Sequence, residues 1–274
     1  MTNAPLTLTL TIDELLAVLQ VMGASTMNGL GDPLAGLSER DQAARLNAGA
    51  ETLMNRGLCR IENDQLVLDD MMVAFVGASL IPDAVLLITA LQPDQSSEPH
   101  YFNATAYITV EHMSPRPGIH LFIHLPTAEA LTNRVATMLA PVAVDPFRAA
   151  QAATWVLPDA QLNAALLAGR AGRTAEVQAI LARHGWSGVA LDALTTDLAT
   201  APSWVGMVGW GLREAQPVGG TSAILYVGAQ HYWFFAPSSS DPTQLAVSSP
   251  DGPSSAKALL RLSDPLLTLM ALAS

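Results

Sequence analysis

Three histidines lie close together in the middle of the chain: His112, His120 and His124. Residues 114–118 between them are rich in proline and end in glycine, which is typical of a tight turn, so the three imidazoles are predicted to share one face of a β-hairpin. Imidazole is a common ligand of zinc and copper, but a metal site would need further ligands in the same place. Because the alternate residues over 119–125 are all apolar, we interpret the histidine face as the wetter side of a sheet, with no metal.

The other reactive groups stand apart from one another. Cys59 is the sole cysteine, no sequence signature marks it as a low-pKa nucleophile, and it is expected to be a small buried apolar residue. Glu111 alternates away from the histidine face. The pairs Asp13-Glu14 and Asp69-Asp70 stand where helices are expected to begin, and helix N-termini attract carboxylates without any catalytic role. Since nucleophile-elbow, phosphate-loop, His-Glu-x-x-His and dinucleotide glycine motifs are also absent, neither an enzyme nor a cofactor is predicted.

Composition narrows the class of partner. Half of the 274 residues are hydrophobic and only 14% are charged, so much of the surface must be formed by small and weakly polar side chains. The chain has 24 acidic and 13 basic residues, a net charge of −11, and Lys257 is its only lysine. An acidic field repels phosphate backbones and anionic membrane surfaces, whereas a basic or apolar protein surface remains a suitable partner.

Cysteine content and hydropathy indicate the compartment of the protein and whether it enters a membrane. A lone cysteine can form no intramolecular disulfide, which favours a reducing compartment. The N-terminus lacks the basic and apolar regions of a signal peptide. The most apolar stretch, residues 71–91, is divided by Pro82 and Asp83 into pieces too short for the roughly 20 residues that a bilayer requires. We expect a cytoplasmic protein with no membrane insertion.

Helix and strand signals alternate along the first 140 residues. Thr11 can cap a helix over 12–22, and Glu14 completes a capping box. The further elements predicted here are a loop over 23–33, a helix over 40–56, a hairpin over 58–68, a helix over 69–80, strands over 85–91, 101–110 and 119–125, and a helix over 126–139.

Prolines punctuate residues 141–158, which are predicted to be a connector, and a similar order of elements follows. The elements predicted in this part are helices over 159–167, 174–183 and 191–200, strands over 204–212, 222–228, 231–236 and 244–248, and a closing helix over 254–262.

Short similarities accompany this repeated order. Residues 53–58 resemble residues 181–186, and in both parts a helix ends at a proline, Pro82 or Pro202, shortly before a strand. Agreement of element order with local sequence favours an internal duplication over chance. We therefore predict an α+β fold in which two structurally related halves, 1–140 and 159–274, pack antiparallel sheet and flanking helices around a pseudo-twofold axis.

Four consecutive aromatic residues, Tyr232 to Phe235, place two rings on each face of a predicted strand. One pair can enter the core, and the other must be covered by a helix, by the other half or by a partner. Tyr232 and Phe234 are therefore candidate partner-binding residues.

The helix–hairpin–helix outline over 40–80 also resembles a winged-helix module, which makes DNA binding a rival function. A recognition helix needs basic residues to meet phosphates. Arg45 and Arg56 supply that charge, but acidic residues in the same segment offset it. These acidic residues are Glu39, Asp41 and Glu51.

Several motifs together resemble the EspG-type proteins associated with ESX (type VII) secretion. They are the N-terminal helix over 12–22, the Leu-x-x-Arg-Gly-Leu helix end and hairpin over 53–68, the helix–proline–strand passage over 80–91, and Trp233-Phe-Phe-Ala-Pro237 before the final helix. Chain length and the two-half organisation agree with this resemblance, which covers nearly the whole chain.

The resemblance implies a cytosolic chaperone that grips the apolar tip of a helical secreted protein or protein pair, such as a mycobacterial PE–PPE pair. It also implies a central antiparallel sheet with a quasi-twofold relation between its halves. In that family the central hairpin lies near the client, so Met113, Arg116 and Pro117 are predicted contacts. The alternatives are a winged-helix regulator and a small-ligand or metal-binding domain that uses the histidine face.

Overall fold

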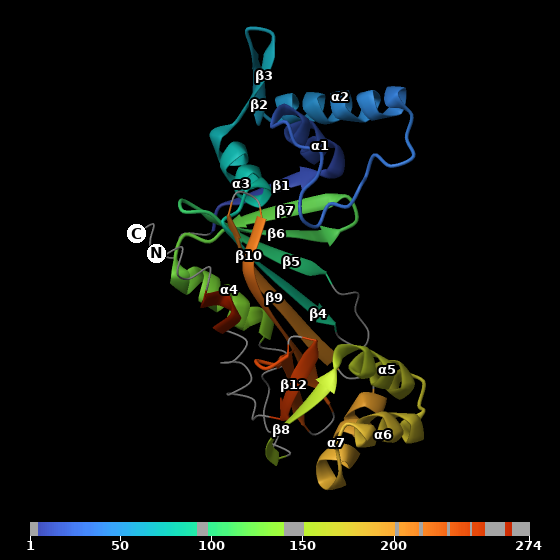
Figure 1. Ribbon diagram of the computed structural model, residues 1–274. Helices are drawn as coiled ribbons and strands as arrows, with labels where there is room; N and C mark the ends of the chain where they lie inside the picture. The colour runs from blue at the N-terminus through green and yellow to red at the C-terminus, as the bar shows by residue number, and fades with distance from the viewer. Residues whose placement is uncertain are drawn as a thin grey trace.

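A computed structural model describes residues 5–91, 98–139, 151–200, 203–213, 216–228, 231–241, 243–249 and 261–264. The molecule is elongated, with one long twisted sheet through its middle and a helical layer near each end (Figure 1).

The first half contains four helices and seven strands in the described residues. In chain order they are β1 (Thr7–Thr11), α1 (Ile12–Val21), α2 (Glu39–Asn55), β2 (Cys59–Glu62), β3 (Gln65–Leu68), α3 (Asp70–Leu80), β4 (Ala84–Leu91), β5 (Pro99–Ala104), β6 (Thr109–Arg116), β7 (Ile119–His124) and α4 (Ala128–Leu139).

The second half contains three helices and five strands over its described residues, followed by one 3-10 turn. In chain order they are β8 (Gln151–Pro158), α5 (Asp159–Arg170), α6 (Thr174–Arg183), α7 (Gly188–Ala199), β9 (Ser203–Arg213), β10 (Gln216–Val227), β11 (Tyr232–Pro237), β12 (Gln244–Ser249) and η2 (Arg261–Ser263).

Ten strands form one antiparallel sheet in the order β1-β7-β6-β5-β4-β9-β10-β11-β12-β8. The two halves of this order match. In each half the strand before the helices lies at the edge of the sheet (β1 or β8), and the strand after the helices lies at its centre (β4 or β9). The two central strands, β4 and β9, pair over their whole overlap, from Ala84 with Gly211 to Leu91 with Trp204. The chain is therefore α+β with two structurally related halves in a pseudo-twofold arrangement, as predicted.

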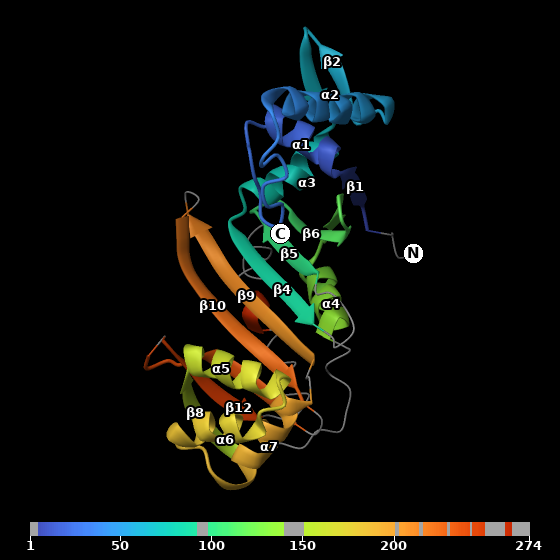
Figure 2. The same cartoon turned by 90° about the vertical axis from the view of Figure 1, so that its right-hand side faces the viewer.

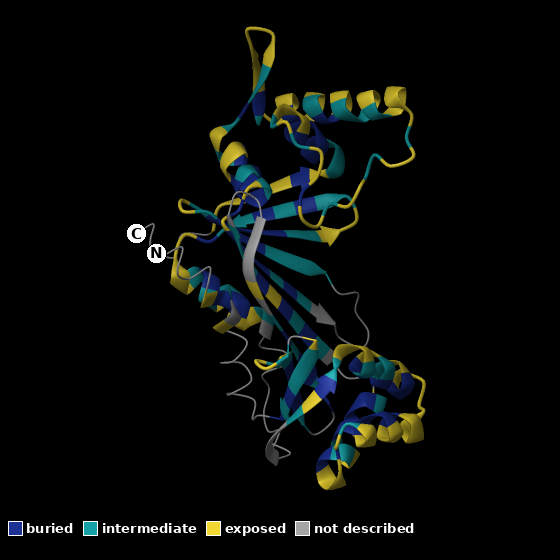
Figure 3. Cartoon of the chain, viewed as in Figure 1, coloured by how far each residue is buried: buried dark blue, intermediate teal, exposed yellow. Residues whose placement is uncertain are grey.

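Two sets of helices cover one face of the sheet at its opposite ends. Helices α1–α3 pack on β1, β6 and β7, and helices α5–α7 pack on β8 and β10–β12 (Figures 1 and 2). Helix α4 packs on the other face, where Leu131 and Val135 meet Leu86 and Phe102. Figure 3 shows that burial concentrates where helices meet the sheet, while the β2–β3 hairpin and the outer side of α2 are exposed. The middle of the face between the two helical layers therefore lies outside both cores.

Local signals explain why the chain enters its helices where it does. The Thr11 side chain accepts from the Glu14 backbone N–H and the Glu14 carboxylate accepts from the Thr11 backbone N–H, which is the predicted capping box. The β2–β3 hairpin turns at Asn63 and Asp64, whose positive φ angles of 50° and 63° suit these two residue types. Within the described residues, no helix combines the length and apolar character needed to span a bilayer.

The structure corrects three element predictions. Residues 7–11 were not predicted as a strand, yet they form the edge strand β1. The strand predicted over 101–110 is two strands, β5 and β6, joined by a turn in which the Ile108 carbonyl accepts from the Thr105 N–H. Residues 151–158 of the predicted connector form β8 at the opposite edge. A closing helix was predicted over 254–262. Its residues 254–260 lie outside the described residues, and residues 261–262 belong to the 3-10 turn η2.

Candidate partner-binding groove

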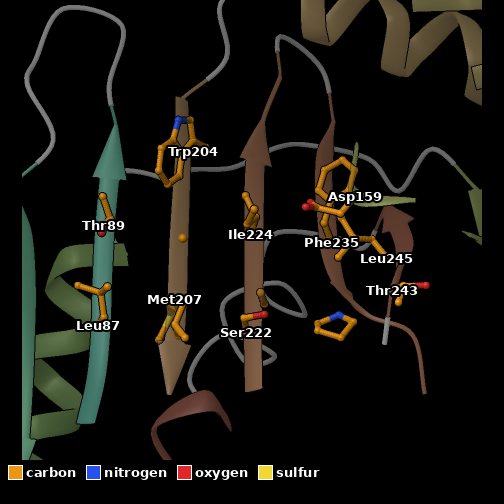
Figure 4. Close-up of a pocket in the computed structure, with 14 residues that line it drawn as sticks. Leu87, Thr89, Asp159, Trp204, Met207, Ser222, Ile224, Phe235, Thr243 and Leu245 are labelled. Carbon is orange, nitrogen blue, oxygen red and sulfur yellow. The ribbon is translucent and has the colours of Figure 1, made fainter. Parts of the chain in front are cut away.

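The open middle of the sheet holds an apolar groove of about 700 Å³ (Figure 4). Its floor is formed by alternate residues of neighbouring strands that the register places side by side: Leu87 with Val208, and Gly206 with Ile224. The wall toward α5 is formed by Phe235, Leu245 and the first residue of that helix. The lining residues are Leu87, Thr89, Asp159, Trp204, Gly206, Met207, Val208, Ser222, Ala223, Ile224, Phe235, Pro237, Thr243 and Leu245.

The side chains of this groove are suited to binding and not to catalysis. Val208 lies on the central strand β9 and is 40% exposed, so an apolar side chain stands open to water in the middle of the sheet. Among the lining residues that the structure describes, Asp159 is the only ionisable one, and it stands at the N-terminus of α5, which favours a carboxylate. The described part of the lining offers Asp159 no second ionisable group with which it could exchange protons. It is suited to burying apolar side chains of another molecule beside a single negative charge.

The three histidines do share one face, as predicted, but the interpretation of that face as the wetter one is wrong. His112 and His120 are buried beneath α1–α3, and their Nε2 and Nδ1 atoms lie 3.1 Å apart. His112 also stacks on Phe122, with ring centroids 4.7 Å apart. No group of three or more His, Cys, Asp or Glu side chains in the described ranges is placed to hold a metal ion.

Burial lowers the pKa of His112 to about 3, and the neighbouring His120 acts in the same direction, while the Asn28 backbone opposes the shift. An unfolded chain binds a proton on this residue near pH 6.5, so stability is fully present above that pH and is lost as pH falls toward 3. We expect His112 to cost about 2 kcal/mol between pH 7.5 and pH 5. Urea unfolding of the wild type and of His112→Asn at both pH values measures this, and equal pH slopes would refute it.

A second buried polar cluster lies on the α4 face. The Glu111 carboxylate is fully buried and accepts from Arg134 Nε at 2.6 Å and from Arg134 Nη2 at 2.8 Å. The His100 Nδ1 atom lies 2.6 Å from the same carboxylate. Burial alone would raise the pKa of Glu111, but these contacts with His100 and Arg134 together lower it. Both carboxylate oxygens are occupied, so the cluster acts as a clamp between the sheet and α4.

A third cluster joins α7 to β11. The buried Asp197 carboxylate accepts from Trp233 Nε1 at 2.8 Å and lies 3.0 Å from His231 Nδ1. The pair Asp197–His231 resembles part of a catalytic triad, which would also need a serine or cysteine nucleophile. Here the carboxylate instead accepts from an indole N–H, a contact that holds two side chains in place. We interpret this cluster as a structural one that fixes α7 against the sheet.

Cys59 is buried, as predicted, and burial raises the pKa of its thiol. A raised pKa disfavours the reactive thiolate. The two arginines considered for DNA binding, Arg45 and Arg56, are already paired: Arg45 lies 2.6 Å from Asp13, and Arg56 lies 2.7 Å from Glu14. Neither arginine is free to meet a phosphate backbone, so the geometry does not favour DNA binding.

Comparison with known proteins gives a counterpart for the whole chain. No protein-family model and no curated protein matches the sequence. Among solved structures, the chain is similar to the Mycobacterium tuberculosis type VII secretion system chaperone EspG5 in complex with the PE25–PPE41 dimer, with a TM-score of 0.64 and 12% sequence identity. The match covers 96% of this chain and 97% of that chain. The fold is similar to that of EspG5. At this identity, the likeness concerns the fold alone.

The EspG-like fold separates the residues that the sequence singled out for binding. Arg116 and Pro117 are exposed at the tip of the β6–β7 hairpin. Met113 faces α4, where Arg134 Nη2 lies 3.9 Å from its sulfur. Phe234 is half-buried in the same core. Tyr232 is fully buried, which corrects its prediction as a contact residue.

The groove itself was missed by the sequence analysis. Its residues come from five strands, the loop before β12 and one helix start, and no strand contributes more than four of them. One signal was available: the β9 segment Trp204-Val-Gly-Met-Val-Gly-Trp210 carries two glycines among large residues, and glycine inside a strand often marks a site that another group approaches closely.

Proposed function

We propose that this chain is a non-enzymatic chaperone that binds the apolar end of a helical secreted protein or protein pair and keeps that end covered before export. The observation that carries the proposal is the open apolar groove over β4, β9 and β10. It is supported by a fold similar to that of a type VII secretion chaperone whose structure contains a bound protein dimer. This role places the chain in the cytoplasm, before the secretion step.

The physical basis of binding is removal of apolar surface from water, worth roughly 25 cal/mol per Å². The floor of the groove is held rigid by the paired strands, so little conformational entropy is lost when a partner docks. A stable complex typically buries about 1,200–2,000 Å² in total. The partner must therefore also touch the surface around the groove, and we propose Arg116 and Pro117 of the exposed hairpin as secondary contacts.

The charge of the chain favours one kind of client. The chain carries a net charge of −11, and Asp159 is the charged residue at the groove. An acidic field attracts partners whose binding end is flanked by basic residues and repels nucleic acid. We propose that the client has such a basic flank.

Capture of the native client tests the proposal. The full chain, tagged and immobilised, is incubated with lysate of its own organism, and bound proteins are identified by mass spectrometry. We expect a small helical secreted protein or pair to be enriched in one-to-one stoichiometry. Enrichment of DNA instead, or turnover of a small molecule by the purified chain, would contradict it.

A further inference from the structure

The pseudo-twofold relation assigns each groove residue a counterpart in the first half. Register pairs define two matching rows of side chains on the helix-covered face, running outward from the sheet centre. The rows are Leu87, Tyr101, His112, Phe122 and Leu8 in the first half, and Gly206, Ile224, Phe235, Val247 and Trp155 in the second. Tyr101 therefore corresponds to Ile224, and His112 corresponds to Phe235.

The junctions between helices and strands agree with this correspondence. In the first half α3 ends at Leu80 and β4 begins at Ala84, and in the second half α7 ends at Ala199 and β9 begins at Ser203. At the sheet edges, Thr11 caps α1 directly after β1, and Pro158 is the N-cap of α5 at the end of β8. The two rows thus hold equivalent places in the two halves.

In the first half this place is filled by the chain itself. The loop between α1 and α2, residues 22–38, folds down onto the sheet (Figure 2), and Met27 is buried in the core with Leu30 packed beside it. Gly29 lies flat on Tyr101: a Cβ there would stand 2.5 Å from Tyr101 Cε2, and its φ of +80° also favours glycine. A turn with one large apolar side chain and one glycine is therefore what fits this place.

The loop is also held by charge. Arg45 of α2 lies 2.6 Å from Asp13, in the first turn of α1, and its Nη1 donates to the Pro33 carbonyl of the loop at 3.0 Å. The second half has a carboxylate at the matching helix start, Asp159. This carboxylate lines the groove.

The second half has no equivalent loop. Helices α5 and α6 are joined by residues 171–173 alone. In the second half, Ile224 is half-buried and lines an open groove, together with an edge of Phe235, which is otherwise buried under α5–α7. Their counterparts Tyr101 and His112 instead contact the loop itself, Tyr101 at Gly29 and His112 at the Asn28 backbone.

We infer that a segment of the client fills the groove of the second half in the way that the chain's own loop, residues 22–38, fills the equivalent place in the first half. The client end would then be a turn with a methionine- or leucine-like side chain against Phe235 and a glycine or similarly small residue flat on Ile224. An arginine or lysine beside this turn would pair with Asp159. This inference rests on the proposed function and defines the client's recognition element by its chemistry.

The chain's own loop is the probe for this inference. A synthetic peptide of residues 23–45 is titrated into the full-length protein with labelled isoleucine, leucine and valine methyl groups. We expect saturable shifts at Ile224, Val208 and Leu245. Ile224→Glu in the protein, or Met27→Asp in the peptide, should weaken binding at least tenfold, and Val73→Glu on exposed α3 should not.

The charge contact is tested in the same titration. Arg45→Gln in the peptide and Asp159→Asn in the protein should each weaken binding about three- to tenfold, with no further loss when the two are combined. Shifts confined to Ile123 and Leu125 on the other face, or no saturable binding at all, would overturn the inference. If the captured client still binds the groove in that case, the proposed function stands and only its recognition element is wrong.

Discussion

Replacement of Val208 by glutamate is expected to abolish client capture while leaving the chain folded. Val208 is 40% exposed in the floor of the groove and pairs with Leu87, so the new carboxylate would stand in the middle of the contact. A carboxylate buried without a partner at the centre of an interface should cost about 2 kcal/mol or more, which is about 30-fold in affinity. A pull-down with each variant measures client capture, and titration of the purified client into the purified variant measures the loss of affinity.

The matched control is Val73→Glu, because Val73 is 43% exposed on α3, away from the groove. It introduces the same charge on a residue of the same type and similar exposure. Thermal unfolding of both variants should show intact folding, and only the Val208 variant should lose the client. Equal client retention by both variants would show that the groove is not the binding surface.

Replacement of Arg134 by methionine is expected to destabilise the chain by about 3 kcal/mol, the usual cost of leaving a buried charge without its partner. Glu111 is fully buried and would retain only the contact with His100. Urea unfolding at pH 7.5 measures the loss. Because Glu111 has a lowered pKa in the folded chain, the contribution of its ionised form is present above its ordinary pKa and fades as pH falls.

The second replacement, Glu111→Leu in the Arg134→Met background, removes the stranded charge and should restore most of the stability. It should also flatten the pH dependence below pH 5 that the cluster imposes on the wild type. If the double variant is as unstable as the single one, the loss comes from packing of α4 and not from the buried charge.

Elements with strong local signals were predictable from the sequence. The capping box at Thr11 and Glu14 located α1, and the helix before Gly57 followed by a short hairpin matched α2, β2 and β3. The edge strands β1 and β8 were not predicted, because each runs directly into a helix with no turn residue between. Their pairing with distant strands, β7 and β12, decides their conformation.

The repeat was found with an alignment that the structure corrects. Matching Pro82 with Pro202 also matches Val85 with Val205. The register places Val85 opposite Trp210 and Val205 opposite Ala90, so the two valines lie on opposite faces of the sheet. A shift by one residue restores the faces, a distinction that sequence similarity between apolar strands cannot make.

The histidine and aromatic predictions show the same limit. Alternation correctly placed His112 and His120 on one face, but which face the helices cover depends on packing between distant parts of the chain. Tyr232 likewise alternates into the core under α4. We propose that the halves, 1–140 and 159–274, arose by duplication and that the loop over 22–38 distinguishes the filled half from the open one.

Hydrogen–deuterium exchange of the chain with and without its captured client shows whether the groove is the surface that binds. We expect slowed exchange in β9 around Trp204–Val208 and in β10 around Ser222–Ile224, with α4 unchanged. Slowed exchange confined to the α4 face, or a complex that leaves both central segments unprotected, would contradict it.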